Sequence, residues 1–554
     1  MKKYLREMST VSITKRLARL GVIAAVATAT MLIAAGCGSS GSDSAKSGDN
    51  LPKAGYKVSK NTPAWKSDKS KDNTLTWYVN ADWWNKSYGK DMITKQIKKD
   101  LNLNIKFVTG DDTKLNTYFA SGKLPDIVTI GDPNSKVART ADQWAYPLQD
   151  LATKYDPYFY KVARTDTLNW YKLKDGKTYG YPNYSNTEAD YKSGKVPARD
   201  AFIIRKDVLA AIGKQDFTTP EGFVKGMAAI KEKFPKLSPF GFNDFSGGNS
   251  SLDNVVQDML GVPIVTKDNK YYARNLDSDY LKWLNAFREV HAAGNISDDS
   301  FTDDSNAFNE KVNAGKYATI MMGSDVNHGI NLQTFASKHP DEQYIAIDGI
   351  QSTVGRKPTL SQAGISGWLI NYISNKSKNP AKAIQVFEYL LSDRGQMLVN
   401  FGIKGQTYED AGDGMVKWTP SALKVQQSDP DKWQNQYRMG EFILFGHDRY
   451  KALNKDSYVK AVWQMQSWGQ KYLTPQFKTE NIAPDPGTQE ARAYSAIQTN
   501  WSTTLVSLIR AKSEADFNAT LKKYKDFEKD NSIDQINKTR DKNIQANMKK
   551  LNMK

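Results

Sequence analysis

Short apolar runs alternate with helical patterns after residue 73. Apolar and β-branched residues predict strands over residues 74–80, 104–109 and 126–130. Between the first two strands, the spacing of Ile93 and Ile97 predicts a helix, and a second short helix precedes the third strand. This order is typical of a parallel sheet with crossover helices. We therefore predict an α/β fold for the body of the chain.

Three later helices have recognisable ends. The pairs Thr219-Pro220 and Asn379-Pro380 each place a capping residue before a proline at the first helical position. A third helical pattern runs from Tyr280 to Val290 and stops at Gly294. We expect its aromatic residues to lie in a core.

The hydropathy pattern at the N-terminus indicates an export signal. A basic start is followed by an apolar run from Leu20 to Ala35 and by Cys37, the only cysteine of the chain. The last residues resemble the lipobox of bacterial lipoproteins, although Ala34 stands where leucine is commonest. The alternatives are a plain cleaved signal and a single membrane span, because the run is close to the ~20 residues that a span needs. We predict a lipoprotein signal peptide over residues 1–36 and lipidation of Cys37.

The composition after the signal indicates a short linker and a folded body. Residues 37–73 are rich in Gly, Ser and Lys, which predicts a flexible tether. The chain has 554 residues and a formal charge of +17, of which +5 lies in residues 1–36, so +12 remains for the rest. No basic block is interleaved with aromatic residues, so we expect no nucleic-acid partner. One cysteine allows no internal disulfide, and we expect a monomer with two or three domains.

Several stretches resemble, in the same order, the extracellular solute-binding proteins of ABC importers that take up oligosaccharides. One of them also resembles a glycine-rich turn of the large, lipoprotein-anchored subgroup. The matching stretches are residues 114–128, 146–151, 175–182, 204–209, 218–223, 313–322, 367–392 and 402–408.

This resemblance implies a two-lobed, periplasmic-binding-protein-like fold of type II, with the ligand in a cleft between the lobes. The chain would cross between lobes near residues 185–200, 358–366 and 472–487. The expected parts are lobe 1 over residues 74–190 and 361–475, and lobe 2 over residues 191–360 and 476–554.

The chemistry of a sugar suggests which residues would line such a cleft. The C–H face of a pyranose stacks on indole rings, and its hydroxyls need amides and carboxylates. Candidates on loops after the first and third strands are Trp83, Trp84, Asn85, Asp132 and Asn134.

The remaining candidates come from the second lobe and from the later crossings. They are Asn249, Asp325, His328, Trp368 and Trp501. For the tryptophans the alternative is core packing. For Asp132 and Asn134 it is an ordinary turn, and for His328 a plain surface position.

We therefore expect a membrane-anchored receptor that captures an oligosaccharide and delivers it to the transmembrane subunits of an ABC permease. It would face outward from the cell membrane of a Gram-positive bacterium. We expect no cofactor and no metal. Some large relatives carry a calcium loop where this chain has residues 233–239, so we expect no calcium there.

Two other function classes stay open. One is a surface-anchored glycoside-processing enzyme, although the serine-hydrolase, zinc-protease and P-loop spacings are absent. Residues 298–304 are rich in Asp, so a glycosidase pair of carboxylates remains an alternative to a solvated loop. The other is a peptide receptor on the same scaffold.

Overall fold

A computed structural model describes most of the chain after residue 50. The described residues are 51–553 without 72, 195, 244–250, 324–329, 362–363, 430, 443 and 455–459. They belong to one compact unit. Cys37, Asn249, Asp325 and His328 lie outside the described residues. Within the described part, no helix is both long and apolar enough to cross a membrane.

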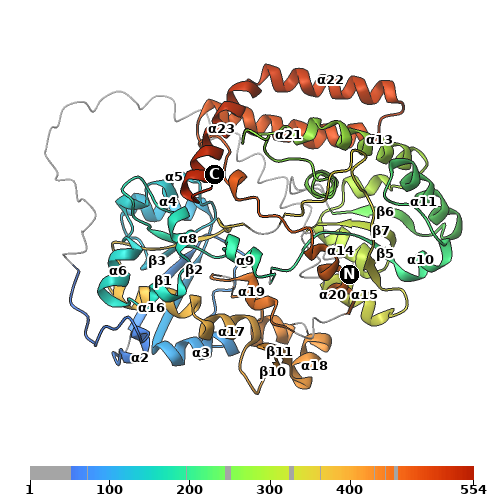
Figure 1. Ribbon diagram of the computed structural model, residues 1–554. Helices are drawn as coiled ribbons and strands as arrows, with labels where there is room; N and C mark the ends of the chain where they lie inside the picture. Colours follow the sequence, from blue (N-terminus) through green and yellow to red (C-terminus); the bar gives the residue numbers. More distant parts are fainter. Residues whose placement is uncertain are drawn as a thin grey trace, which may run out of the picture. The chain divides into compact units, whose positions relative to one another are not determined.

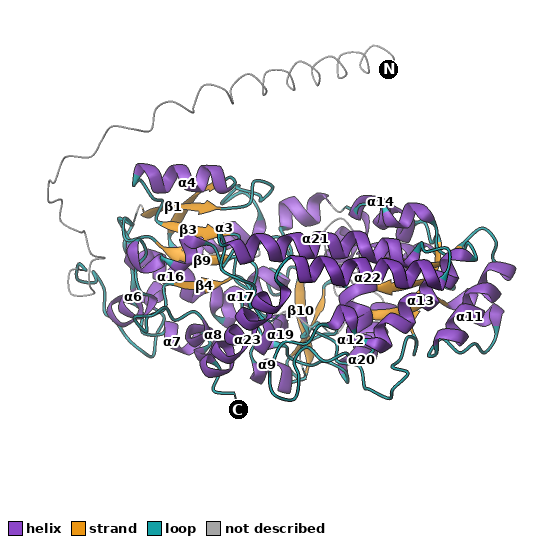
Figure 2. Cartoon of the chain, turned by 90° about the horizontal axis from the view of Figure 1, so that it is seen from above, coloured by secondary structure: helices purple, strands orange, loops and turns teal. Residues whose placement is uncertain are grey.

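The first lobe is built on a five-stranded sheet with the order β2-β1-β3-β9-β4. Its strands are β1 (Asn73–Val79), β2 (Leu103–Thr109), β3 (Ile127–Ile130), β4 (Gly180–Pro182) and β9 (Ile370–Ile373). Figure 1 labels β1, β2 and β3 of this sheet, and Figure 2 labels β1, β3, β9 and β4. β1 pairs in parallel with β2 and with β3, whereas β9 runs antiparallel to its neighbours β3 and β4. The three predicted strands and their parallel arrangement are confirmed.

The second lobe is built on a four-stranded sheet with the order β6-β7-β5-β8. Its strands are β5 (Ala201–Arg205), β6 (Ser238–Phe242), β7 (Tyr317–Met322) and β8 (Tyr344–Ala346). β6 and β7 are parallel, and β5 is antiparallel to both β7 and β8. The α/β class predicted for the body is therefore confirmed in both sheets.

Helices cover both faces of the first sheet. Those of the first lobe are α2 (Ala64–Ser67), α3 (Met92–Leu101), α4 (Asp112–Ser121), α5 (Lys136–Arg139), α6 (Leu148–Tyr155), α7 (Phe159–Val162), α8 (Thr165–Trp170), α9 (Glu188–Lys192), α16 (Pro380–Leu391), α17 (Asp393–Phe401), α18 (Pro420–Ser428) and α19 (Asp448–Lys451). A two-stranded hairpin, β10 (Tyr408–Gly412) and β11 (Met415–Trp418), extends this lobe. Leu75, Trp77 and Val79 of β1 point into the core shared with α16, while Tyr78 points to the opposite face.

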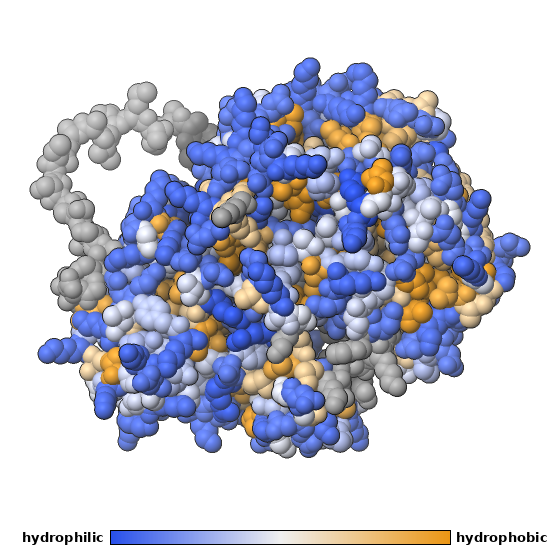
Figure 3. Space-filling model, viewed as in Figure 1, coloured by the Kyte–Doolittle hydropathy of each residue, from blue (hydrophilic) through white to orange (hydrophobic). Residues whose placement is uncertain are grey.

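The second lobe carries the remaining helices. They are α10 (Lys206–Ile212), α11 (Pro220–Lys233), α12 (Val256–Met259), α13 (Ser278–Ala292), α14 (Ser305–Asn313), α15 (Ile330–Lys338), α20 (Lys460–Gln470), α21 (Gln489–Ile509), α22 (Glu514–Asp530) and α23 (Ile533–Lys550). α21 and α22 lie side by side in both views (Figures 1 and 2). The face shown in Figure 3 is mostly hydrophilic, with small separate hydrophobic patches.

The predicted helix starts are confirmed by their caps. The Thr219 hydroxyl accepts a hydrogen bond from the Gly222 N–H at 3.2 Å, and the Asn379 side chain accepts one from the Lys382 N–H at 3.1 Å. α13 ends two residues before Gly294, which has a φ of +73°. Its aromatic residues are buried in the second core, as expected.

The third crossing between the lobes comes earlier than the predicted region, residues 472–487. α20 packs against β8, and the Gln464 side chain bonds the backbone N–H and C=O of Ala346 at 2.7 and 2.8 Å. Met465 lies fully buried in the same lobe. The expected end of the first lobe at residue 475 is therefore wrong, because α20 already belongs to the second lobe. Its short apolar pattern resembles that of any surface helix, so sequence alone could not assign it to a sheet.

The prediction of a flexible tether is wrong for residues 51–71. Leu51 is buried in the first core, and the Lys154 ammonium and the Tyr155 hydroxyl of α6 donate hydrogen bonds to the carbonyls of Leu51 and Pro52. The Trp65 ring meets Tyr389 edge to face at 5.3 Å. The prediction was wrong because it relied on the average composition of the segment. A few apolar residues are enough to hold it in place when they pack on a core formed by the rest of the chain.

Buried acidic groups lie where this segment meets the first lobe. Asp68 forms an ion pair with Lys382 of α16 at 2.9 Å, and both side chains are almost fully buried. Asp156 accepts a hydrogen bond from the Ala64 N–H at 3.2 Å. Burial, and to a smaller extent the neighbouring Asp156, raises the pKa of the Glu388 carboxyl on α16 to about 9. Glu388 is therefore protonated in the folded protein at neutral pH.

This shifted group predicts a pH-dependent stability. In the unfolded chain Glu388 ionises near ~4.3, so folding takes up a proton and the free energy of unfolding falls as the pH rises from about 5 to 9. We expect Glu388→Gln to raise the free energy of unfolding by about 2 kcal/mol at pH 8, with a smaller gain at pH 5. Urea denaturation at the two pH values measures this difference. The control is Glu409→Gln on β10, and equal pH profiles for wild type and Glu388→Gln would contradict the prediction.

Candidate functional site

The topology of the first sheet gathers four loops at one edge. β1, β3 and β4 end at this edge, and the antiparallel β9 begins there. Ligands of α/β proteins collect at the carboxyl ends of the strands. The loops at this edge are residues 80–91, 131–135, 183–187 and 364–369.

Two of the predicted residues form an exposed aromatic pair at this edge. Trp83 follows β1 and Trp368 precedes β9, and their rings stack with centroids 6.2 Å apart and planes inclined by 25°. Their exposed fractions are 63% and 43%, and no other tryptophan whose side chain the structure describes is exposed. Solvent-exposed stacked indoles offer a flat apolar surface to a ligand.

The backbone before β9 fixes the position of Trp368. The buried Asn183 side chain accepts hydrogen bonds from the N–H groups of Trp368 and Leu369 at 3.2 and 2.9 Å. Gly367 has a φ of +60°, and a Cβ there would lie 2.6 Å from the Tyr184 carbonyl oxygen. Only glycine fits this turn without strain. Asn183 and Gly367 are therefore positioning residues, a role that sequence reasoning assigned to neither of them.

Trp84 is not part of the exposed pair. Its side chain is 3% exposed and packs against Phe107 and Phe442, with ring centroids 4.7 and 5.8 Å away. The Arg438 guanidinium lies 4.8 Å above its ring. The prediction that Trp84 contacts a ligand is wrong, because one of two adjacent tryptophans in this loop completes the core.

Arg438 also holds the loop that carries both tryptophans. Its guanidinium is fully buried and donates hydrogen bonds to the backbone carbonyls of Asn85 and of Ser87, the latter at 2.7 Å. Asp91 forms an ion pair with it at 3.4 Å. These contacts turn Trp84 inward and leave Trp83 in solvent.

The other predicted residues of the first lobe lie near the same edge. Asn85 is partly exposed, and its side-chain oxygen accepts a hydrogen bond from the Ser87 N–H at 3.0 Å. Asp132 is exposed and accepts the Asn134 N–H at 2.8 Å, which is an ordinary turn contact. Asn134 also lines a cavity. These residues remain candidates for ligand contact.

Trp501 lies away from the exposed pair. It is 2% exposed in the second core, where its ring meets Tyr524 at 4.9 Å and its indole N–H donates to Asp253 at 3.0 Å. Its prediction as a stacking platform is therefore wrong, because α21 turns this face toward α13 and α22. The predicted residues of the second lobe, Asn249, Asp325 and His328, lie outside the described residues.

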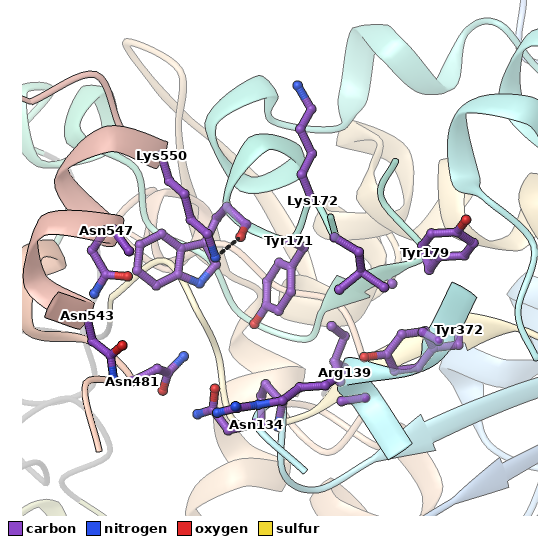
Figure 4. A pocket seen from close by; sticks show the side chains of 18 of the residues that line it. Asn134, Arg139, Tyr171, Lys172, Tyr179, Tyr372, Asn481, Asn543, Asn547 and Lys550 are labelled. Atoms are coloured by element: carbon purple, nitrogen blue, oxygen red, sulfur yellow. Dashed lines mark hydrogen bonds between the residues drawn. The ribbon is translucent and has the colours of Figure 1, made fainter. Parts of the chain in front are cut away.

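A cavity of about 220 Å³ lies between the first lobe and the C-terminal helix α23 (Figure 4). It is bounded by α5, the end of α8, strands β4 and β9, and α23. Most of its walls are amide, aromatic and cationic side chains. The labelled lining residues are Asn134, Arg139, Tyr171, Lys172, Tyr179, Tyr372, Asn481, Asn543, Asn547 and Lys550.

The amides from α23 have fixed orientations. The Asn543 side-chain nitrogen donates to the Ile482 carbonyl at 3.1 Å, and the Asn547 nitrogen donates to the Glu480 carbonyl at 2.7 Å. Together with Lys550 they follow the spacing i, i+4, i+7, which puts them on one face of the helix. This spacing was the signal in the sequence that could have revealed them.

Two carboxylates of the Asp-rich run are paired with a lysine. In the run over residues 298–304, the Lys311 ammonium contacts Asp299 and Asp303 at 2.7 and 2.5 Å. Among the described residues, no group of three or more His, Cys, Asp or Glu side chains is placed to hold a metal ion.

The two sheets define a two-lobed α/β protein, and comparison with known proteins gives its family. Residues 82–397 match the family of bacterial extracellular solute-binding proteins. The match covers more than half of the chain, so the chain belongs to this family, and the resemblance drawn from its motifs is confirmed.

Two curated proteins of Bacillus subtilis (strain 168) are similar in sequence. Lipoprotein LipO is 25% identical over 318 residues, which cover 53% of this chain and 59% of LipO. The polygalacturonan/rhamnogalacturonan-binding protein YtcQ is 25% identical over 356 residues, 61% of this chain and 68% of YtcQ. The aligned part of this chain thus spans less than two thirds of LipO.

Solved structures share the fold. The S. pneumoniae ABC-transporter substrate-binding protein FusA, solved in complex with kestose, aligns with a TM-score of 0.62 and 17% identity over 86% of this chain and 99% of FusA. This similarity confirms the predicted two-lobed, periplasmic-binding-protein-like fold.

The tryptophans differ in burial, so replacing each with alanine should lower the free energy of unfolding by a different amount. We expect Trp84→Ala to lower the free energy of unfolding by about 3–5 kcal/mol, because it empties a packed site and removes one of the two aromatic rings, Trp84 and Phe442, over which Arg438 lies. Trp83→Ala and Trp368→Ala should each change it by less than about 0.5 kcal/mol. Urea denaturation of the three variants measures this, and a large loss in Trp83→Ala would show that its ring is part of the core.

Proposed function

We propose that this protein is a membrane-anchored receptor that captures an oligosaccharide at the carboxyl edge of the first sheet and delivers it to an ABC permease. The observation that carries the proposal is the exposed Trp83–Trp368 stack, which lies where ligands of α/β folds bind. Exposed indoles beside Asn85, Asp132 and Asn134 match the two sides of a sugar, its C–H face and its hydroxyl rim.

The relatives agree with this ligand class. YtcQ is named for binding polygalacturonan and rhamnogalacturonan, and FusA was solved with kestose. A receptor of this kind binds its ligand without changing it, needs no cofactor and acts as a monomer. Hinge closure of the two lobes around the sugar would give the permease a shape to recognise. Asn249, Asp325 and His328 remain proposed contacts from the second lobe.

A lipid on Cys37 would hold the receptor on the outer face of the cell membrane. LipO, a lipoprotein by name, supports this anchor. Because the chain is already docked at Leu51, the stretch from Cys37 to Leu51 spans at most about 50 Å. The body would therefore stay close to the membrane and its permease.

Binding to neutral oligosaccharides tests the function. A glycan present at about 100 times its Kd should stabilise the chain from residue 38 onward by ~2.7 kcal/mol in a thermal-shift assay. We expect Trp83→Ala and Trp368→Ala each to weaken binding at least tenfold by calorimetry. The control is Trp433→Ala, which removes a partly buried indole that packs on Trp418 of β11 with ring centroids 5.1 Å apart. The glycan should be recovered intact by chromatography.

Two outcomes would contradict this proposal in different ways. Cleavage of the glycan would identify a glycoside-processing enzyme. Stabilisation by short peptides and by no glycan would identify a peptide receptor on the same fold.

The anchor is tested separately by Cys37→Ser in the full chain. We expect the wild-type protein to take up labelled palmitate and to sediment with the membrane, and the variant to lose both properties. A variant that still sediments would show that the apolar run from Leu20 to Ala35 spans the membrane. Release of the wild-type protein into the medium would instead indicate a plain cleaved signal.

A further inference from the structure

The cavity beside α23 has an excess of positive charge. Two cationic side chains, Arg139 and Lys550, face it against one acidic residue, Asp485, whereas the exposed Lys172 points its ammonium away from them (Figure 4). Neither Trp83 nor Trp368 lines the cavity, and of the residues proposed at the edge of the first sheet only Asn134 does. An excess of cations in a partly enclosed space attracts an anionic ligand.

Lys550 has no acidic partner in the described part of the chain. Its ammonium donates a hydrogen bond to the Trp170 carbonyl at 3.1 Å and lies 5.3 Å from the Trp170 ring centroid. Desolvation, and then repulsion from Arg139, lowers the pKa of the Lys550 ammonium. Two cations that repel each other across one cavity would both be stabilised by an anion between them.

A ligand can replace Asp485 as the ion-pair partner of Arg139. Arg139 forms an ion pair with Asp485, and the two side chains are 38% and 66% exposed. Ion pairs as exposed as this one contribute little to stability. A ligand carboxylate could therefore replace or share this contact, since a guanidinium binds carboxylates through two parallel hydrogen bonds.

The rest of the cavity fits a sugar ring better than an inorganic anion. Four asparagines offer amides for hydroxyl groups, and Tyr171, Tyr179 and Tyr372 offer aromatic surface. The volume, about 220 Å³, is below the ~300–1,000 Å³ of sites for drug-sized ligands, so it suits a single sugar unit and not a whole oligosaccharide.

We propose that this cavity binds a sugar unit that carries a carboxylate, so that the preferred cargo is an acidic oligosaccharide. Arg139 and Lys550 would bind the carboxylate, and Asn543 and Asn547 the hydroxyls. The inference rests on the proposed function, because it names the class of sugar that the same receptor takes.

Paired glycans that differ only in charge test this inference. We would titrate the protein from residue 38 onward with oligogalacturonides and oligoalginates, and with their methyl-esterified forms, by calorimetry at low and moderate salt. For every acidic glycan that binds, we expect an affinity at least tenfold higher than that for its methyl ester. This difference should decrease as the salt concentration rises. Thermal unfolding without ligand checks that every variant is folded.

Two variants and one control locate the effect. Arg139→Gln and Lys550→Gln should each lower the affinity for the acidic glycan at least tenfold and leave the affinity for its ester within about twofold. Lys549→Gln removes the neighbouring charge on α23, which does not line the cavity, and should change neither affinity. If Lys549→Gln lowers the affinity for the acidic glycan to the same extent, the effect comes from the overall charge of the protein. The proposal that the cavity is the binding site would then be wrong.

The results separate the two proposals. If esters and neutral glycans bind as tightly as the acidic forms, the acidic-sugar inference is wrong and the oligosaccharide receptor stands. If the acidic preference exists but survives both cavity variants, the cavity is not its site. If no glycan of any charge binds, both proposals fail.

Discussion

The direction of the strands in the first sheet is the constraint on which the candidate site depends. β1, β3 and β4 run the same way, so their loops meet at one edge, and β9 enters the sheet from that edge in the opposite direction. Residues almost 300 positions apart in the chain, Trp83 and Trp368, therefore stack on each other. No local feature of either loop would bring the two rings together.

The contacts of two buried polar side chains, Arg438 and Asn183, then determine which tryptophans at this edge are exposed to solvent. Arg438 binds the carbonyls of the loop after β1 and lies over Trp84, which keeps that ring in the core. Asn183 binds the backbone N–H groups at the start of β9 and fixes the turn that carries Trp368. Buried polar groups of this kind are costly unless they are hydrogen-bonded, so their contacts specify a single arrangement of the exposed residues.

The sequence predicted the parts of the fold that depend on local patterns. The first three strands, the helix caps at Thr219 and Asn379 and the burial of the aromatic face of α13 were predicted from spacing alone, and the family from ordered motifs. Long-range packing was not predictable in the same way. The docking of residues 51–71, the assignment of α20 to the second lobe and the burial of Trp84 and Trp501 all depend on surfaces formed by distant segments. The face of α23 that lines the cavity was visible as a spacing, but without a partner surface it was indistinguishable from a solvated helix face.

Hydrogen–deuterium exchange with a saturating glycan tests most directly whether the edge of the first sheet is the binding site. The glycan would be the one that gives the largest thermal shift. The account predicts slower exchange in peptides that cover residues 80–87 and 364–370, and unchanged exchange in α10 and α11 on the far side of the second sheet. Unchanged exchange in both of the first two regions, with the glycan bound at saturation, would contradict it.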